Sequence, residues 1–128
     1  MAMSEEMKPV KGVVIFTNGT YEERVFKQLK DLQDGVGGWI EPVRLYDGKG
    51  NSYATAYVDD EGLLKSKPMN HIGGALSFLL GNNPMLAGDM VIVGNADNDG
   101  WDTDINPTLL AFIKQILPEK TEQEDELV

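Results

Sequence analysis

The sequence predicts an α+β fold, a mainly antiparallel sheet of about five strands with three helices packed on it. Short segments rich in β-branched and aromatic residues alternate with Asn-Gly and glycine-rich turns, which is typical of antiparallel strands. Three other segments repeat apolar residues at helical spacing and end at a glycine or a proline. These two patterns together indicate strands and helices that share one core.

The first strands are expected to form a hairpin. Val13–Phe16 is a β-branched run, and Thr20–Phe26 follows it as a second strand. Asn18 and Gly19 between them predict a type I′ turn, because both residues tolerate positive φ angles.

A short helix follows the hairpin. Leu29, Leu32 and Val36 lie on one helical face, and the glycines at 35, 37 and 38 then end the helix. We expect at least one of these glycines to take the left-handed position after the last helical turn.

The next strands should pair with each other. Residues 39–46 alternate in a period of two that places Trp39 in the core, and Pro42 puts this strand at a sheet edge or at a bulge. Residues 52–58 should be its antiparallel partner, with a further short strand at 63–64.

The second half supplies two helices and a central strand. Asn70 is expected to cap the second helix, the apolar run 88–94 to form a central strand, and Asn106-Pro107 to open the third helix. The expected buried stripes are Ile72, Ala75, Leu76, Leu79 and Leu80 in the second helix, and Leu109, Leu110, Ile113, Ile116 and Leu117 in the third.

Length and composition limit the class of protein. The 128 residues suit one domain, expected at 12–118, between a disordered leader at 1–11 and a disordered acidic tail at 119–128. The chain has no cysteine, which excludes disulfides and thiolate chemistry. No apolar run approaches the roughly 20 residues of a membrane span and no secretory signal opens the chain, so the expected location is the cytoplasm.

Several segments carry a resemblance to a known family. They are FKQLKDLQDGVGGWIEPVRL, VDDEGLL, Pro68-x-Asn70 and GDMVIVGNADNDG, in that order. The chain resembles a small family from bacteriophages and actinobacteria that is catalogued only as a domain of unknown function, with the pattern Leu-x-x-Leu-Gln-x-x-Val-Gly-Gly-x-Ile-Glu as its most specific motif. The resemblance covers about residues 12–117 and implies a small, often phage-encoded, intracellular accessory protein. It implies no catalytic residues.

The charge is unusual. The formal net charge is −10, and between Lys67 and Lys114 the chain holds five aspartates and no lysine or arginine. Such a field repels nucleic acid, so we expect no direct DNA or RNA binding. A protein partner with a basic surface, or a cation, fits this charge better.

The segment 95–106 has the highest density of side chains that could bind a ligand or a metal ion. It partly matches the calcium loop pattern, and its possible ligands are Asn95, Asp97, Asp99 and Trp101. Asn106 stands where a bidentate glutamate belongs, and Asp102 where an apolar residue belongs. The alternative is a solvated turn near the positive end of the third helix.

Two functions remain open from the sequence. The first is a non-enzymatic accessory protein that binds a partner protein through an Asp-rich face, with the contact residues Trp101, Asp97, Asp99, Asp102 and Asp104. The second is a sponge or small enzyme for a nucleotide-like molecule. The shortage of basic residues near the loops counts against it, and it requires a pocket lined by Arg24, Arg44 and lysines from the sheet. Gly73-Gly74 within the second helix also suggests close packing against another element or another chain, and the latter would fit a homo-oligomer interface.

Overall fold

The computed structural model describes residues 6–82 and 86–121. Five strands form one sheet in the order β2-β1-β5-β4-β3, and all four neighbouring pairs are antiparallel. The strands are β1 (Glu6–Ile15), β2 (Tyr21–Gln28), β3 (Ile40–Tyr46), β4 (Ser52–Asp59) and β5 (Met90–Val93). The helices are α1 (Leu29–Val36), α2 (His71–Leu79) and α3 (Pro107–Ile116). The predicted α+β fold is confirmed.

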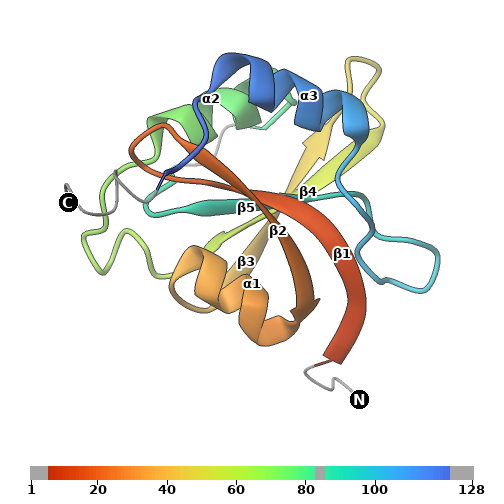
Figure 1. Ribbon diagram of the computed structural model, residues 1–128, viewed down its shortest axis with the longest axis horizontal. Coiled ribbons are helices and arrows are strands. Elements are labelled where there is room, and N and C mark those ends of the chain that lie inside the picture. Colours follow the sequence, from red (N-terminus) through yellow and green to blue (C-terminus); the bar gives the residue numbers. More distant parts are fainter. Residues whose placement is uncertain (1–5, 83–85, 122–128) are drawn as a thin grey trace.

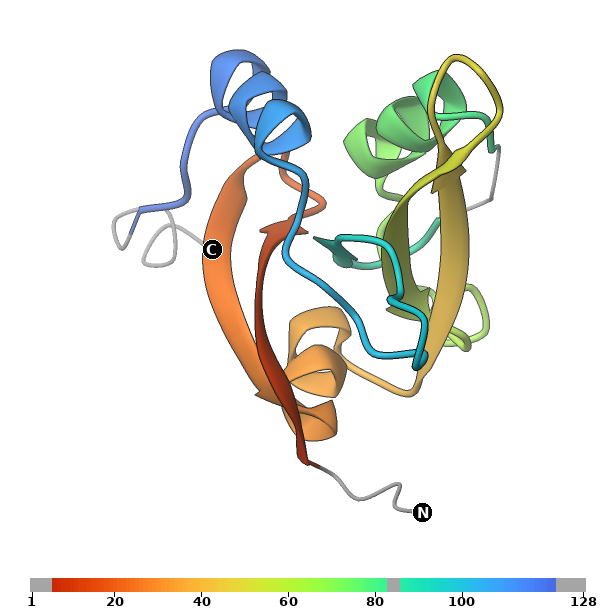
Figure 2. The ribbon, with the colours of Figure 1, turned by 90° about the vertical axis from the view of Figure 1, so that its right-hand side faces the viewer.

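The helices divide between the two faces of the sheet. Helix α1 covers one face, and α2 and α3 cover the other (Figures 1 and 2). The core on the α1 face is built on Phe26, Leu32 and Val36, and the core on the α2/α3 face on Leu45, Leu76 and Ile113. All four residues of β5 are buried, which confirms the prediction of a central strand from the apolar run.

The described ends of the chain are more ordered than predicted. Strand β1 begins at Glu6, so the expected leader is wrong for residues 6–11, where Val10 is buried and pairs with Phe26. At the other end, Lys120 N donates to Tyr21 O at 2.8 Å, so the expected disorder is also wrong there. The rest of both segments, residues 1–5 and 122–128, lies outside the described residues.

The hairpin is present, but its turn is not type I′. Gly19 has φ +87°, whereas Asn18 has no positive φ, and a type I′ turn needs positive φ at both central residues. Gly19 N donates to Phe16 O at 3.0 Å, and Phe16 N donates to Thr20 O at 2.9 Å. This is a three-residue loop that ends in a left-handed glycine.

Strand β3 confirms the role of Pro42 but not that of Trp39. β3 is an edge strand, where a residue without an N–H is tolerated. Trp39 lies one residue before β3 and is 66% exposed, so its predicted packing in the core is wrong. The period-two alternation that buries Leu45 is limited to β3 and does not extend to Trp39, which precedes the strand.

The predicted strand at 63–64 is absent. Gly62 N donates to Asp59 O at 3.1 Å and Lys65 N donates to Glu61 O at 2.9 Å, so this segment is a series of tight turns. Leu64 is 84% exposed, since a turn has no buried face.

Both predicted helix caps form. Asn70 Oδ1 accepts from Gly73 N, and Asn106 Oδ1 accepts from Thr108 N, each at 2.8 Å. The predicted stripes are too wide, because helices of nine and ten residues bury only a narrow face. The predicted stripe residues that are exposed are Ala75, Leu79 and Ile116.

Candidate functional site

An open cleft lies between the end of α1 and the turns that follow β4. Its volume is about 460 Å³. We call it the Trp39 cleft, and it is lined by Gln33, Asp34, Gly37, Gly38, Trp39, Glu61 and Lys65. It joins two segments that are well separated in the sequence.

Beneath the lining of the Trp39 cleft lies a buried carboxylate, Asp59, which is in contact with Gly38 and Lys65. The Asp59 side chain is fully buried, and its Oδ2 lies 3.0 Å from Lys65 Nζ and 2.5 Å from Lys67 Nζ. Asp59 Oδ1 accepts from Glu61 N at 2.9 Å. Burial alone raises the pKa of this carboxyl, but the hydrogen bonds from Lys67, Glu61 N and Lys65 outweigh it and lower the pKa to about 2. Asp59 is therefore ionised at neutral pH.

Lys67 connects this carboxylate to the end of α1. Besides Asp59, its ammonium donates to Val36 O and Gly37 O, each at 3.0 Å. Gly37 has φ +78°, and its N–H donates to Gln33 O at 2.7 Å, so the predicted left-handed glycine cap is confirmed. One cation thus neutralises Asp59 and satisfies carbonyls at the negative end of the helix.

Gly38 brings the main chain directly against Asp59. A Cβ atom at Gly38 would lie 2.6 Å from Asp59 Oδ2, a distance that no real side chain tolerates. On the other side, Trp39 O accepts from Asp60 N at 3.0 Å. The main chain around Trp39 is therefore fixed on both sides, while its indole extends from the surface with 66% exposure.

The charges of the Trp39 cleft favour a cationic ligand. Asp34 and Glu61 line it together with Lys65, whose ammonium is already paired with Asp59. Lys30 pairs with Asp34 at 3.2 Å, but both side chains are more than half exposed and such a pair exchanges readily with water. An exposed indole beside carboxylates offers a cation–π contact and an ion pair to one guanidinium or ammonium group.

The segment 95–106 contains residues that were expected to bind a partner or calcium. Asp97 Oδ1 accepts from Asp99 N at 2.9 Å and from Trp101 N at 3.0 Å, so this carboxylate closes its own turn. The hydrogen bond from Trp101 N is the main reason that the Asp97 pKa is lowered. Trp101 is 38% exposed, less than Trp39.

The other polar residues of this segment bond to separate parts of the fold. Asn95 exchanges hydrogen bonds with Ser52, with Nδ2 donating to its carbonyl oxygen at 2.7 Å. Asp102 accepts from Tyr57 Oη, and Asp104 Oδ1 accepts from Lys11 N, each at 2.8 Å. In residues 6–82 and 86–121 no three His, Cys, Asp or Glu side chains are placed to hold a metal ion.

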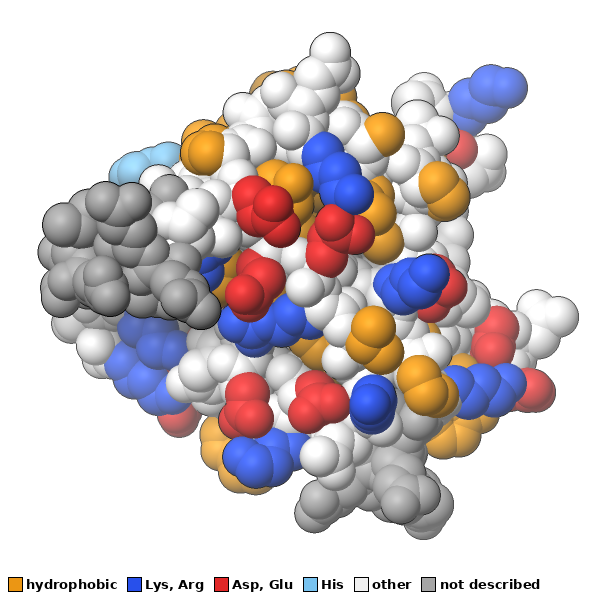
Figure 3. Space-filling model, viewed as in Figure 1, with side chains coloured by type: hydrophobic (Ala, Val, Ile, Leu, Met, Phe, Trp, Pro, Cys, Tyr) orange, Lys and Arg blue, Asp and Glu red, His pale blue; other side chains and the backbone are white. Residues whose placement is uncertain are grey.

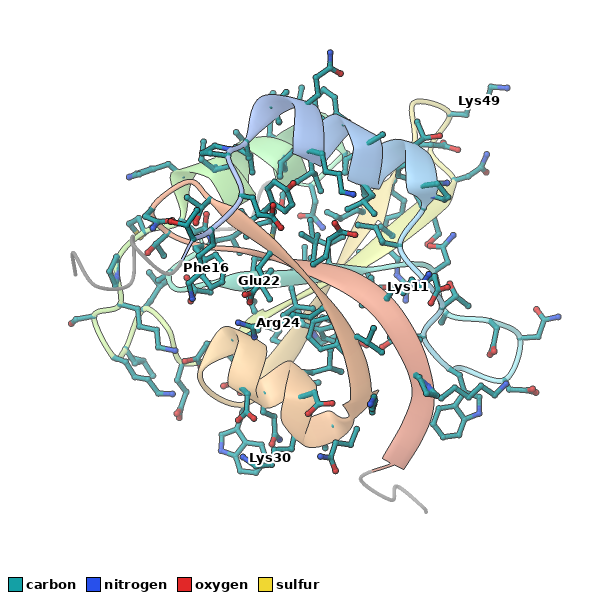
Figure 4. The ribbon with its side chains drawn as sticks, viewed as in Figure 1. Lys11, Phe16, Glu22, Arg24, Lys30 and Lys49 are labelled. Atoms are coloured by element: carbon teal, nitrogen blue, oxygen red, sulfur yellow. The ribbon has the colours of Figure 1, made fainter. Side chains whose placement is uncertain are left out.

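The two arginines of the nucleotide-pocket hypothesis do not converge. Arg24 is on β2 and Arg44 on β3, the strands at opposite edges of the sheet. Arg24 instead bonds to Glu22 at 2.6 Å on the same strand, and Figure 4 shows the two side chains next to each other. On the face seen in Figure 3, acidic and basic side chains are interspersed.

Sequence reasoning missed the Trp39 cleft. Its parts, the glycines after α1 and the segment that follows Val58, both belong to the motifs of the family resemblance. The sequence signal for the cleft was the pair Gly37-Gly38. A single glycine suffices to end a helix, so the second glycine indicated a close approach of the main chain to another group, which is Asp59.

Comparison with known proteins gives one family. The family model described as "Domain of unknown function (DUF3846)" matches residues 7–117, so the predicted resemblance is confirmed. No curated protein and no solved structure matches the chain. No helix in the described part of the chain is long and apolar enough to cross a membrane.

Proposed function

This chain belongs to the DUF3846 family, and we propose that it is a non-catalytic binding protein that holds a partner protein at the Trp39 cleft. The observation that carries the proposal is the exposure of Trp39 on a main chain that is fixed on both sides. Tryptophan is among the residues that contribute most to protein–protein affinity. An aromatic side chain on an ordered main chain binds with little further loss of conformational entropy.

The charge of the chain supports a basic partner surface. The net charge of −10 attracts positively charged proteins over long distances, and Asp34 and Glu61 add local carboxylates beside the indole. We therefore expect the partner to present an arginine or lysine side chain to Trp39. The proposal includes an accessory role in the cytoplasm of a host cell, as expected for a phage-type family.

The contact differs from the one that the sequence suggested. The Asp-rich segment offers fewer carboxylate oxygens than its composition implies, because Asp97, Asp102 and Asp104 accept hydrogen bonds from within the protein. The Trp39 cleft combines an aromatic surface with acidic groups. We therefore assign the binding to the cleft rather than to Trp101.

The test is a comparative capture experiment. The tagged full chain and its Trp39→Ala variant are each used to capture proteins from a host lysate at low and at high salt. We expect a specific partner that the wild type retains at low salt and the variant loses. A central tryptophan contributes roughly 2–4 kcal/mol, which corresponds to a loss of affinity of about 30-fold or more.

Trp101→Ala is the matched control, because it removes the same side chain from the segment 95–106. Both indoles are exposed, so neither substitution opens a core cavity. A partner lost with Trp101→Ala but retained with Trp39→Ala would overturn the proposal and assign the contact to the Asp-rich segment.

A further inference from the structure

The sheet has two edges, and they differ in how many main-chain groups are satisfied. At β3, Tyr46 N donates to Leu80 O at 2.7 Å, Asn82 Nδ2 donates to Arg44 O at 3.0 Å, and Pro42 has no N–H to offer. This edge is therefore closed from Arg44 to Tyr46, and Pro42 removes one further N–H from it.

At β2, contacts within the described residues close the two ends of the edge. Tyr21 N donates to Pro118 O at 3.1 Å and Tyr21 O accepts from Lys120 N, so a segment of the same chain already pairs there in the parallel direction. At the other end, Lys27 N donates to Asp31 Oδ2 at 2.8 Å.

Between these ends, Glu23 and Val25 direct their main-chain groups outward. Val25 pairs with Lys11, whose own N–H and C=O are used by Asp104 and Ile105 on the side away from β2. When the main-chain groups of one residue in an antiparallel pair point away from the partner strand, those of the residue opposite it point outward as well. The pattern repeats every second residue, so the N–H and C=O of Glu23 also point outward. Neither residue's outward N–H or C=O has a hydrogen-bond partner within residues 6–82 and 86–121.

A hollow lies on each side of this open stretch. On the α3 side, a cavity of about 250 Å³ is lined by Lys11, Gly12, Glu23, Arg24, Val25, Ile105 and Leu110. On the α1 side, one of about 490 Å³ is lined by Arg24, Val25, Phe26, Lys27, Gln28, Asp31 and Asp34. Val25 borders both cavities and is 50% exposed. Figure 4 shows Arg24 and Glu22 on the same strand.

We propose that the outward main chain of Glu23 and Val25, here called the β2 edge, binds an extended segment of a partner protein as an added strand. Side chains of an added strand point alternately to the two faces of the sheet. One apolar side chain of the peptide would enter the α3-side cavity beside Ile105 and Leu110. The peptide residues before and after it would be charged or polar and would contact Arg24 and Asp31 on the other face.

Two features favour an extended peptide as the occupant. The β2 edge continues directly from Tyr21, where residues 118–120 already bind in extended form through the same kind of hydrogen bonds. The next outward N–H along β2, that of Lys27, already donates to Asp31 Oδ2. This hydrogen bond ends the open stretch and limits the length of the added strand. The site is separate from the Trp39 cleft and does not depend on the function proposed for that cleft.

The test uses random linear peptides displayed on filamentous phage and selected on the immobilised full chain. The best binder is synthesised, and its affinity is measured for the wild type and for Val25→Pro. Proline removes the outward N–H of Val25 without removing a hydrogen bond between β1 and β2. We expect affinity to fall about tenfold or more, and the amides of Glu23 and Val25 to exchange hydrogen more slowly in the complex.

Further variants separate the outcomes. Val25→Lys keeps the N–H but places a charge at the apolar cavity, so it should also weaken binding and serves if Val25→Pro does not fold. Val25→Thr keeps size and N–H and should weaken binding less than either. Lys49→Ala, in the turn far from β2 in Figure 4, is the control that should bind as the wild type does.

Three results would overturn the proposal. They are a selection that yields no binder, peptides that bind Val25→Pro as well as the wild type, and a concentration-dependent dimer of the wild type that Val25→Pro abolishes. The dimer would assign the β2 edge to a second copy of the chain.

Discussion

Replacing Asp59 with asparagine removes the buried charge beneath the Trp39 cleft without changing the size of the side chain. In the wild type the pKa of Asp59 is lowered from 3.8 to about 2, which corresponds to about 2–3 kcal/mol of stability at pH 7. Removing one partner of a buried pair costs up to about 3–5 kcal/mol, but Lys65 and Lys67 are partly exposed and can turn toward water. We therefore expect Asp59→Asn to lower the free energy of unfolding by about 2–3 kcal/mol.

The pH dependence of this loss distinguishes a charge effect from a packing effect. A lowered pKa in the folded state stabilises the protein above the unfolded pKa of 3.8, and this stabilisation is lost as the pH falls through about 2. The difference in stability between the wild type and Asp59→Asn should therefore shrink to a small fraction of its value at pH 7 when the pH reaches 2. Comparing the two proteins cancels the titration of the other carboxyl groups.

The assay is urea unfolding followed by circular dichroism at several pH values between 2 and 7, with Glu61→Gln as the matched control. Glu61 also lies at the cleft, but only its main chain bonds to Asp59. A loss for Asp59→Asn below about 0.5 kcal/mol at pH 7 would refute the ionic account, since the buried pair predicts several times more. An equal loss at pH 7 and at pH 2 would show that packing, and not charge, is responsible.

Three further predictions concern other parts of the structure. Gly37→Ala forces a side chain into φ +78° and should cost about 1–2 kcal/mol in urea unfolding. Asn70→Ala removes a cap on Gly73 N and donors to two buried carbonyls, so its thermal unfolding should indicate a loss of roughly 3–4 kcal/mol. Millimolar calcium should leave the melting temperature unchanged, because carboxylate oxygens of Asp97, Asp102 and Asp104 accept hydrogen bonds from within the protein; a rise that saturates with calcium would contradict this.

Signals that act within a few residues predicted the structure well. Asn70 and Asn106 cap helices because their side chains reach N–H groups two or three residues ahead, and sequence spacing contains that geometry. Pro42 marks an edge strand for an equally local reason, the missing N–H. The continuous apolar run of β5 predicts burial on both faces, and its four residues are buried.

Features that depend on distant parts of the chain were missed or wrong. Lys67 joins Asp59 to the end of α1, where it bonds to Val36, 31 residues earlier in the chain, and no periodicity encodes this contact. The turn at Asn18-Gly19 formed with a three-residue loop because β1 and β2 set its register, and the dipeptide alone does not fix the loop length.

The two tryptophans show why composition is a weak guide to which side chains are exposed. Trp101 lies among aspartates and Trp39 at the start of an apolar alternation, so the sequence favoured Trp101 for recognition and Trp39 for the core. In the structure Trp39 is the more exposed, at 66% against 38%, because β3 begins one residue later. Asp97 meanwhile turns inward to the main chain of its own loop, and only acidic groups that remain available to a partner contribute to its affinity. Polar groups that the fold has already used contribute little to a partner contact, and this criterion is why we propose the Trp39 cleft, and not the segment with more aspartates, as the binding surface.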